Sequence, residues 1–309
     1  MNETVLLLAA AIASGTPLVL AGLGLLINEK SGVLNLGAEG MMLVAAVAGF
    51  ATALGTGSEI LALGAGAAAG AVAAAAFGVV VIGLNANQYA AGLALSIFGA
   101  GLSAFVGIGY VGKKLEGPAA PLAGSIGHWL GELPLIGPLL FRQHPVVWLS
   151  LALTLLVAWL LYRTRAGLVL RAVGESPESA HALGYPVRTI RFAAVLTGGA
   201  LCGVAGACLS VVYAPMWVEG LVAGRGWIAL ALTTFATWRP GRVLVGAWLF
   251  GGVTLLQFHL QAQGVAIASQ LLAMLPYLAT IVVLALISRN PAWIRANMPA
   301  SLGRPFHAG

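Results

Sequence analysis

The amino-acid sequence predicts an all-α polytopic protein that crosses a membrane about 8–10 times within one domain covering residues 1–309. Hydrophobic residues make up 60% of the chain, and its mean hydropathy is +0.97. Charged residues make up only 8%, whereas a soluble domain carries about a quarter. The 42 glycines fit the same class, because small residues allow membrane helices to pack closely.

The expected spans follow from the lengths of the apolar segments, since a bilayer core takes roughly 20 residues of helix. Eight segments have about that length: residues near 4–27, 37–56, 60–84, 88–111, 145–162, 191–213, 241–262 and 267–288. A ninth apolar segment, residues 227–237, has only about half of it. It follows the glycine-rich residues 219–226, and this combination predicts a broken or re-entrant helix.

The basic residues between the spans predict the orientation. If residues 163–191 face the cytoplasm and nine segments cross, eleven basic residues lie inside and four lie outside. Basic residues concentrate on the cytoplasmic side of membrane proteins, so this count predicts an N-terminus outside and a C-terminus inside. The longest outer loop then covers residues 112–144, where four prolines predict a stiff cap.

The polar segment 164–190 predicts a short helix over about residues 177–183. Ser176 can cap its first turn, and Pro177 suits the first helical position because its missing N–H needs no partner there. Gly184 is placed to end the helix. Helices under about 12 residues are marginal in water, so packing must hold this one.

Several function classes are disfavoured by the composition. The chain has no aspartate, which weakens any Asp-based Mg²⁺ site or nucleophile, and no G-x-x-x-x-G-K-[ST] loop to cradle phosphate. Cys202 and Cys208 are six residues apart and do not share a helix face, so we expect packing rather than a metal or disulfide. The net charge of +6 sits in loops, which predicts orientation and not nucleic-acid binding. No cofactor bound by this chain is expected.

One long stretch, residues 171–207, and four shorter ones carry a resemblance to a known family. The motifs RAVGESP (171–177) and LTGGALCGVAGA (196–207) resemble the coupling segment of ABC import permeases that serve ribose-type sugars and branched-chain amino acids. Four further stretches resemble motifs of that family, mostly of its nucleoside and simple-sugar subgroup: NEKSGVLNLGAEGMM (28–42), LPLIGPLLFRQHP (133–145), GRGWIALA (224–231) and PASLGRPF (299–306). The chain departs from the family at Ala236, where a glycine is usual.

The resemblance implies a type II ABC importer-like permease in a bacterial plasma (inner) membrane. It implies three protein partners: an extracytoplasmic substrate-binding lipoprotein, a second homologous permease subunit and a cytoplasmic ATP-binding cassette subunit that holds ATP and Mg. This chain would then be a non-catalytic subunit surrounded by membrane lipids. Segment 164–190 would contact the ATPase through Arg171, Glu175, Ser176, Pro177, Glu178, His181, Gly184 and Tyr185.

Polar residues in or beside the apolar runs are candidates for the solute path, because such residues are costly in lipid and usually face the bundle interior. Amide side chains both donate and accept hydrogen bonds, which suits a neutral nucleoside or sugar. Capping of helices at the interface is a strong alternative for the amides, and a structural ion pair is the alternative to a gate for the last two residues of the set. The candidates are Asn35, Glu39, Asn87, Gln88, Glu219 and Arg225.

Two other function classes remain as alternatives. An ion-coupled secondary transporter or channel would need intramembrane acids, for which Glu39 is the best candidate although it sits near a predicted inner boundary. An intramembrane enzyme would need a pair such as Ser with His, or His-Glu-x-x-His. His259 is followed by Leu260 and not by a glutamate, so the second motif is absent.

Overall fold

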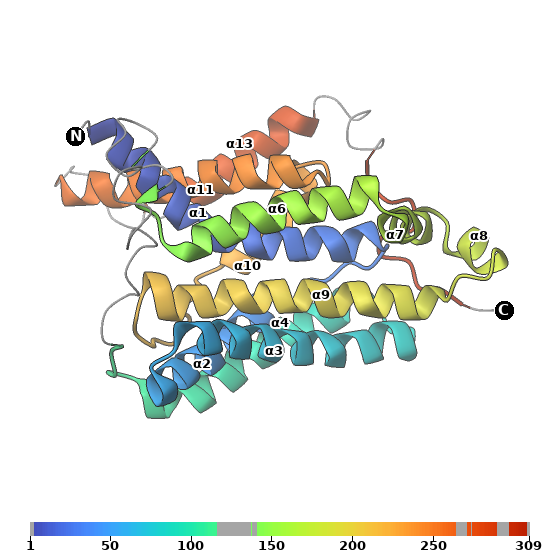
Figure 1. Ribbon diagram of the computed structural model, residues 1–309, viewed down its shortest axis with the longest axis horizontal. Helices are drawn as coiled ribbons and strands as arrows, with labels where there is room; N and C mark the ends of the chain where they lie inside the picture. Colours follow the sequence, from blue (N-terminus) through green and yellow to red (C-terminus); the bar gives the residue numbers. More distant parts are fainter. Residues whose placement is uncertain are drawn as a thin grey trace.

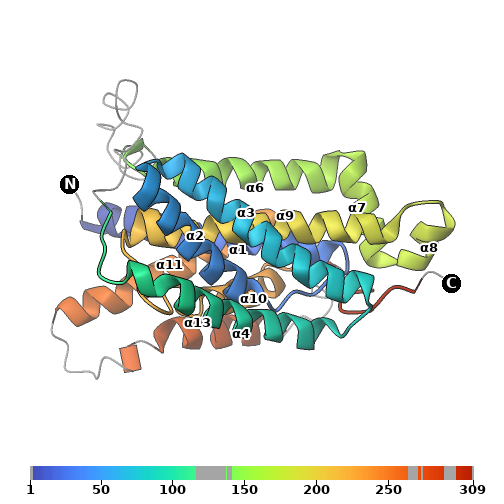
Figure 2. The ribbon, with the colours of Figure 1, turned by 90° about the horizontal axis from the view of Figure 1, so that it is seen from below.

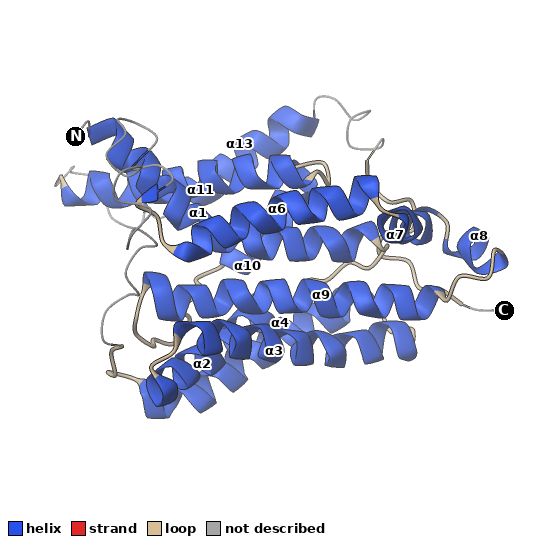
Figure 3. Ribbon diagram, in the orientation of Figure 1, coloured by secondary structure: helices blue, strands red, loops and turns tan. Residues whose placement is uncertain are grey.

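The computed structural model describes residues 3–115, 137, 141–263, 271–272, 274–288 and 297–307. Within these ranges every regular element is a helix, and a single isolated bridge joins Lys114 to Met216. Figure 3 shows the helices running side by side in one bundle. The prediction of an all-α bundle is therefore confirmed.

Seven of the described helices are long and apolar enough to cross a membrane. They are α1 (Glu3–Lys30), α2 (Ala38–Thr56), α3 (Glu59–Gly78) with the π-helix η1 (Val79–Gly83), α4 (Gln88–Gly107) with the 3-10 helix η2 (Ile108–Tyr110), α6 (Pro145–Arg163), α9 (Val187–Cys208) with the π-helix η4 (Leu209–Tyr213), and α11 (Pro240–Ala262). Each begins and ends within four residues of a predicted span. Helix α13 (Leu275–Ser288) represents the predicted span 267–288, part of which lies outside the described residues.

The bundle has two ends, which we name by a lysine at each (Figure 1). The Lys30 end carries the last residue of α1, the start of α11 and the C-terminal tail, residues 297–307. The Lys114 end carries the Lys114–Met216 bridge and the contact between the carboxylate of Glu59 and Nε2 of His144 (3.2 Å). Helix α1 begins at the Lys114 end and the tail lies at the Lys30 end, so the two termini lie on opposite sides (Figure 1).

Helix α9 lies at the centre of the bundle and contacts α1, α2 and α3 (Figures 1 and 2). Glycines allow these contacts to be made by backbone. A Cβ on Gly203 would lie 2.2 Å from the carbonyl oxygen of Gly66 on α3, and a Cβ on Gly24 of α1 would lie 2.5 Å from that of Gly198. Small residues thus set the spacing of the central helices, as expected where lipid provides no hydrophobic driving force.

The same packing predicts the outcome of a substitution between α2 and α4. A Cβ on Gly99 would lie 2.4 Å from the Cα of Gly40, so Gly99→Val must push the two backbones apart. We expect a loss of about 1–3 kcal/mol of stability, seen as a lower midpoint of thermal unfolding in detergent. Gly101→Val is the matched control, because a Cβ on Gly101 of the same helix meets open space. Equal midpoints for the two variants would contradict the packing described.

Helix α10 (Arg225–Phe235) is the short ninth segment that the sequence predicts. Its 11 residues cover about 16 Å, roughly half the thickness of a bilayer core. The chain enters from the Lys114 end, where Met216 pairs with Lys114, and leaves at the Lys30 end, where Arg239 lies beside Asn297. Residues 214–224 and α10 together therefore complete one passage through the bundle.

Two further helices lie at the Lys30 end between α6 and α9. They are α7 (Arg165–Glu175) and α8 (Pro177–Ala182), and they extend past the ends of the spans (Figure 1). Thr164 caps α7, since its hydroxyl accepts from the N–H of Gly167 at 3.1 Å. The sequence reading assigned no helix to residues 165–175. The outer loop 112–144 lies mostly outside the described residues, so its stiffness stays a prediction.

Candidate functional site

Helix α8 has the start and stop that its sequence predicts. The hydroxyl of Ser176 accepts from the N–H of Ser179 at 3.3 Å, and Pro177 occupies the first helical position. Gly184 has a φ of 87°, in the left-handed region where glycine carries no steric penalty. The helix ends at Ala182, one residue before the predicted 183, because the chain already turns toward that glycine.

The tip of α8 offers a mixed surface to solvent. Glu178, His181, Gly184 and Tyr185 are all exposed, and Leu183 is 79% exposed. Glu178 and His181 are three residues apart and share one face of the helix. Pro177, in contrast, is buried and belongs to the base of the helix. The tip therefore presents a charge, two rings and an apolar side chain beyond the spans (Figure 1).

The C-terminal tail supplies the packing that holds so short a helix. Phe306 is buried in a small cluster with Val173 of α7, Ala180 of α8 and Val187 of α9. The ring of His181 stacks edge-on against that of Phe306, with centroids 5.5 Å apart. The tail thus lies against α8, and the position of α8 depends on residues more than a hundred positions away in sequence.

Arg191 attaches the tail to the bundle. Its side chain is 2% exposed and donates three hydrogen bonds in different directions. The acceptors are the carbonyl oxygens of Ser31 (3.1 Å) and Arg304 (3.1 Å) and the hydroxyl of Ser301 (2.9 Å). Ser301 in turn donates to the carbonyl of Gly174 at 2.7 Å. A single guanidinium therefore joins α1, α9 and the tail, and the Ser301 bond adds α7.

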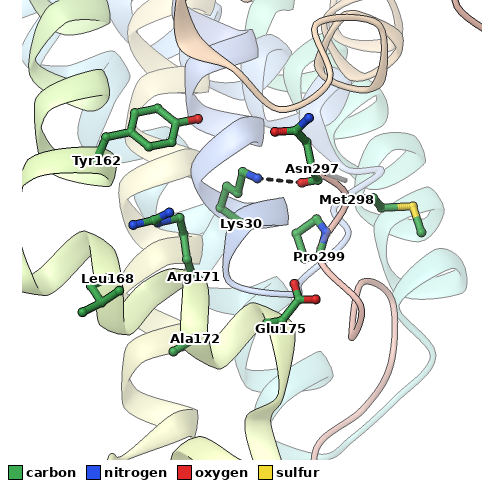
Figure 4. A pocket seen from close by; sticks show the side chains of 9 residues that line it. All are labelled: Lys30, Tyr162, Leu168, Arg171, Ala172, Glu175, Asn297, Met298 and Pro299. Carbon is green, nitrogen blue, oxygen red and sulfur yellow. Dashed lines mark hydrogen bonds between the residues drawn. The ribbon is translucent and has the colours of Figure 1, made fainter. Parts of the chain in front are cut away.

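A pocket of about 330 Å³ lies beside this junction, between α1, α6, α7 and the tail (Figure 4). The ammonium of Lys30 donates to the carbonyl oxygen of Asn297 at 2.7 Å. The guanidinium of Arg171 lies 5.4 Å from the centroid of the Tyr162 ring. Sequence reasoning placed Arg171 and Glu175 with the α8 contact residues. The structure instead places both on α7, lining this pocket and apart from the α8 tip.

The three amides proposed for the solute path all bond to backbone. The side-chain oxygen of Asn35 accepts from the N–H of Gly37 at 2.8 Å, and that of Asn87 accepts from the N–H groups of Tyr89 and Ala90. Gln88 accepts from Leu34 at 2.7 Å and donates to a tail carbonyl. These geometries match the alternative in which the amides cap helices and turns.

Glu39 has a different place, at the start of the half-length helix α10. Its two carboxylate oxygens accept from the N–H of Gly224 at 2.8 Å and the N–H of Gly226 at 2.7 Å. The first N–H groups of a helix have no partner within it, and they carry a partial positive charge that a carboxylate neutralises. Gly224 has a φ of 80° and lets the chain turn into the helix. Glu39 thus fixes where α10 begins inside the bundle.

Glu219 and Arg225, the two charged candidates on either side of the glycine-rich residues, do not form an ion pair with each other. Glu219 is exposed in the loop before α10. Arg225 is half-buried and donates from Nη1 to the carbonyls of Leu221 (3.4 Å) and Val222 (3.2 Å). Its positive charge lies close enough to Glu39 to attract the carboxylate. Arg225 therefore belongs with the start of α10.

Sequence reasoning missed a buried acid at the other end of α10. Glu29 is 1% exposed, and its carboxylate accepts from the hydroxyl of Thr233 at 3.1 Å and from the indole N–H of Trp238. Thr237 and Trp238 have φ values of 48° and 52°, which are uncommon for residues with side chains. The available signal is an acid two residues beyond the predicted span 4–27, where a carboxylate at the end of a membrane helix calls for a polar partner. Both ends of α10 are thus held by glutamates of neighbouring helices.

Metal ligation has no candidate among the described ranges, where no group of three His, Cys, Asp or Glu side chains could hold an ion. Cys202 and Cys208 are both free thiols, buried in α9. Their surroundings are those of small packing residues, as the spacing predicts.

Comparisons with known proteins place this arrangement among membrane permeases. The family described as "Branched-chain amino acid transport system / permease component" matches residues 7–287. The chain is 40% identical to the putative glucose ABC transporter permease protein TsgC13 of Haloferax volcanii, over 97% of each chain. It is 32% identical to the nucleoside ABC transporter permease protein NupC of Lactococcus lactis, over 93% of each. It is 29% identical to the guanosine ABC transporter permease protein NupQ of Bacillus subtilis, over 98% of this chain and 97% of the relative. No solved structure matches.

Proposed function

Because the chain belongs to the branched-chain amino acid transport system permease family, we propose that it forms half of the path of an ABC importer for a nucleoside or a simple sugar. The observation that carries the proposal is near full-length similarity to permeases named for glucose, nucleosides and guanosine. These solutes share a hydroxylated sugar ring. A common path for them needs to accept that ring, while selection between them is made largely by a binding protein.

The source of free energy in this proposal is a separate ATP-binding cassette subunit, which binds ATP and Mg and docks on α8. ATP binding can shift the permease only if the ATPase contacts its two states differently, so the docking element must be joined to the moving parts. Helix α8 meets both needs. Its tip is exposed, and its base connects through Phe306 and the tail to the bundle. The remaining partners are a second homologous permease subunit and an extracytoplasmic substrate-binding lipoprotein.

The orientation belongs to the same proposal. The Lys30 end faces the cytoplasm, because α8 must meet a soluble ATPase there. Among the described residues, more basic side chains lie at the Lys30 end than at the Lys114 end. Basic residues concentrate on the cytoplasmic side of membrane proteins, so this excess supports the proposed orientation. The N-terminus then lies outside and the C-terminal tail inside. The multi-pass chain sits in the plasma membrane.

Within the path, we assign the polar groups at the start of α10 to the region that solute passes. Half-helices whose N-termini lie inside the membrane form binding sites in many transporters. Glu39 and Arg225 lie at that N-terminus. The amides at 35, 87 and 88 act instead by holding the backbone that surrounds it.

The test of the ATPase contact is co-purification with the partner subunit after Glu178→Arg. Reversing one exposed charge at a docking surface is expected to lower ATPase association about tenfold, because like charges then meet across the interface. Glu219→Arg is the matched control, since it makes the same change on an exposed glutamate far from α8 and is expected to retain the ATPase. Wild-type association and uptake in the Glu178→Arg variant would contradict the proposed lever.

The comparisons do not support the alternative of an ion-coupled secondary transporter, because the similar proteins are named ABC transporter permeases and match nearly the whole chain. Reconstitution separates the two. The chain alone in liposomes with an ion gradient is expected to accumulate no solute, and addition of the ATPase and binding protein with ATP is expected to start uptake. Uphill uptake by the chain alone would overturn the proposed function.

A further inference from the structure

The Lys30 end carries two adjoining pockets that share two residues. The first is the pocket of about 330 Å³ between α1, α6, α7 and the tail (Figure 4). The second, of about 530 Å³, lies between the ends of α6 and α11. Tyr162 and Asn297 line both, so the two form one continuous site. Neither pocket touches Glu39 or the start of α10.

The shared site is strongly basic. Among the described residues, its linings include four cations, Lys30, Arg171, Arg239 and Arg242, against one carboxylate, Glu175. Arg171 and Arg239 lie close enough to Lys30 for their charges to repel it, and among the described residues Glu175 and Glu29 oppose them. Concentrating like charges in this way is unfavourable unless an anion is bound among them.

Lys30, Arg239 and Arg242 each donate a hydrogen bond within the fold, whereas Arg171 keeps one donor that the described residues leave unused. Its guanidinium lies over the ring of Tyr162, which stabilises a cation without neutralising it. Its Nε is buried and has no hydrogen-bond partner among the described residues. A buried donor without an acceptor is costly, and an oxygen of a bound anion would satisfy it.

The second pocket adds an apolar side to the same site. Ala158, Pro240 and Gly241 leave room between α6 and α11, and a Cβ on Gly241 would meet open space. Along α6 the exposed side chains continue as Leu155 (72% exposed) and Trp159 (58% exposed), and along α11 as Val245 (55% exposed). An apolar surface thus runs from the basic pocket toward the middle of the spans.

We propose that this site binds one anionic phospholipid, with its phosphate among Lys30, Arg171 and Arg239 and an acyl chain in the groove between α6 and α11. Charge complementarity selects an anion, and basic pockets between membrane helices recognise such headgroups. The apolar groove selects the lipid over a soluble phosphate, because a free anion has no use for it. The bound lipid joins α6 and α7 to the tail, which in turn holds α8.

The test measures lipid binding to the purified full-length chain by native mass spectrometry. Phosphatidylglycerol and phosphatidylcholine with identical acyl chains serve as the two probes. The wild type is expected to retain phosphatidylglycerol selectively. Arg239→Gln is expected to lower its affinity about fivefold, the effect of one basic residue near an anionic lipid, and to leave phosphatidylcholine unchanged. Arg188→Gln removes an exposed charge at the same end outside both pockets and is expected to change neither.

A second pair of variants tests the groove without changing charge. Gly241→Leu places a side chain in the open space between α6 and α11 and is expected to weaken phosphatidylglycerol binding at least fivefold. Gly64→Leu adds the same side chain at an equally open position on α3 and is expected to have no effect.

Three results would overturn the proposal. Equal loss in Arg188→Gln would show diffuse attraction to the surface. The site would be assigned to a soluble anion by two results together. Gly241→Leu would bind phosphatidylglycerol like the wild type, and calorimetry would show binding of inorganic phosphate that Arg239→Gln weakens. Equal retention of the two lipids by the wild type would show that no anionic headgroup is recognised.

Discussion

Replacing Arg191 by methionine is expected to destabilise the Lys30 end by about 3–5 kcal/mol, the largest effect of any single substitution considered. Methionine fills much of the same volume but donates no hydrogen bond. The carbonyls of Ser31 and Arg304 and the hydroxyl of Ser301 would lose their buried donor together. Each lost hydrogen bond from a charged donor costs about 1.5–3 kcal/mol, and the losses accumulate although Arg304 keeps the amide of Gln88 and Ser301 keeps its bond to Gly174.

The measurement is thermal unfolding in detergent, combined with limited proteolysis of the tail. Arg191→Met is expected to lower the unfolding midpoint and expose the tail to cleavage. Arg191→Lys should be intermediate, because an ammonium is a single point that cannot reach three acceptors in the directions a guanidinium fork can. Arg188→Met, one turn earlier on the same helix and exposed, is expected to unfold like the wild type. A stable, uncleaved Arg191→Met protein would contradict this account of the tail.

Glu39→Ala is expected to produce the second large effect, a loss of about 2–4 kcal/mol together with loss of solute uptake. The substitution removes both acceptors from the start of α10, leaving the N–H groups of Gly224 and Gly226 without them. It also removes the negative charge that faces the positive end of the helix. Helix α10 would then lose its fixed starting point inside the bundle.

The variant Glu39→Gln distinguishes the contribution of the side chain's size and hydrogen bonding from that of its negative charge. The amide keeps one acceptor oxygen and nearly the same volume, so the stability loss should fall to about 1–2 kcal/mol. Glu219→Gln is the matched control, because Glu219 is an exposed glutamate of the loop before α10 and its change should stay within about 0.5 kcal/mol. Unfolding midpoints and uptake in reconstituted complexes measure the two effects. Indistinguishable behaviour of Glu39→Ala and Glu219→Gln would contradict the capping role.

The spans and the caps could be predicted because their causes are local. Twenty apolar residues in a row have one stable arrangement in lipid, and this alone places α2, α3 and α4 within a few residues. The start and stop of α8 follow from Ser176, Pro177 and Gly184, which act on their own turn of backbone. Local rules of this kind need no knowledge of the rest of the fold.

The residues that hold the bundle together could not be predicted because their partners are distant in sequence. The sequence places Arg191 at the boundary of a span, and nothing near it indicates that its acceptors lie at positions 31, 301 and 304. Glu29 meets Thr233 and Trp238 only because α1 and α10 are neighbours in the folded chain. The polarity of Asn35 and Asn87 was recognised, but the sequence left open whether backbone or solute would use it.

The attachment of the tail has a consequence for biogenesis. Arg191 enters the bilayer with α9 while residues 301 and 304, its acceptors, are still being translated. The nascent protein therefore passes through an intermediate in which this cation has its Ser31 acceptor and still lacks the other two, and residues that follow the spans complete the packing at the Lys30 end. A stop codon placed just before position 301 would leave the described spans intact and still yield a chain that membrane quality control can recognise as unfinished.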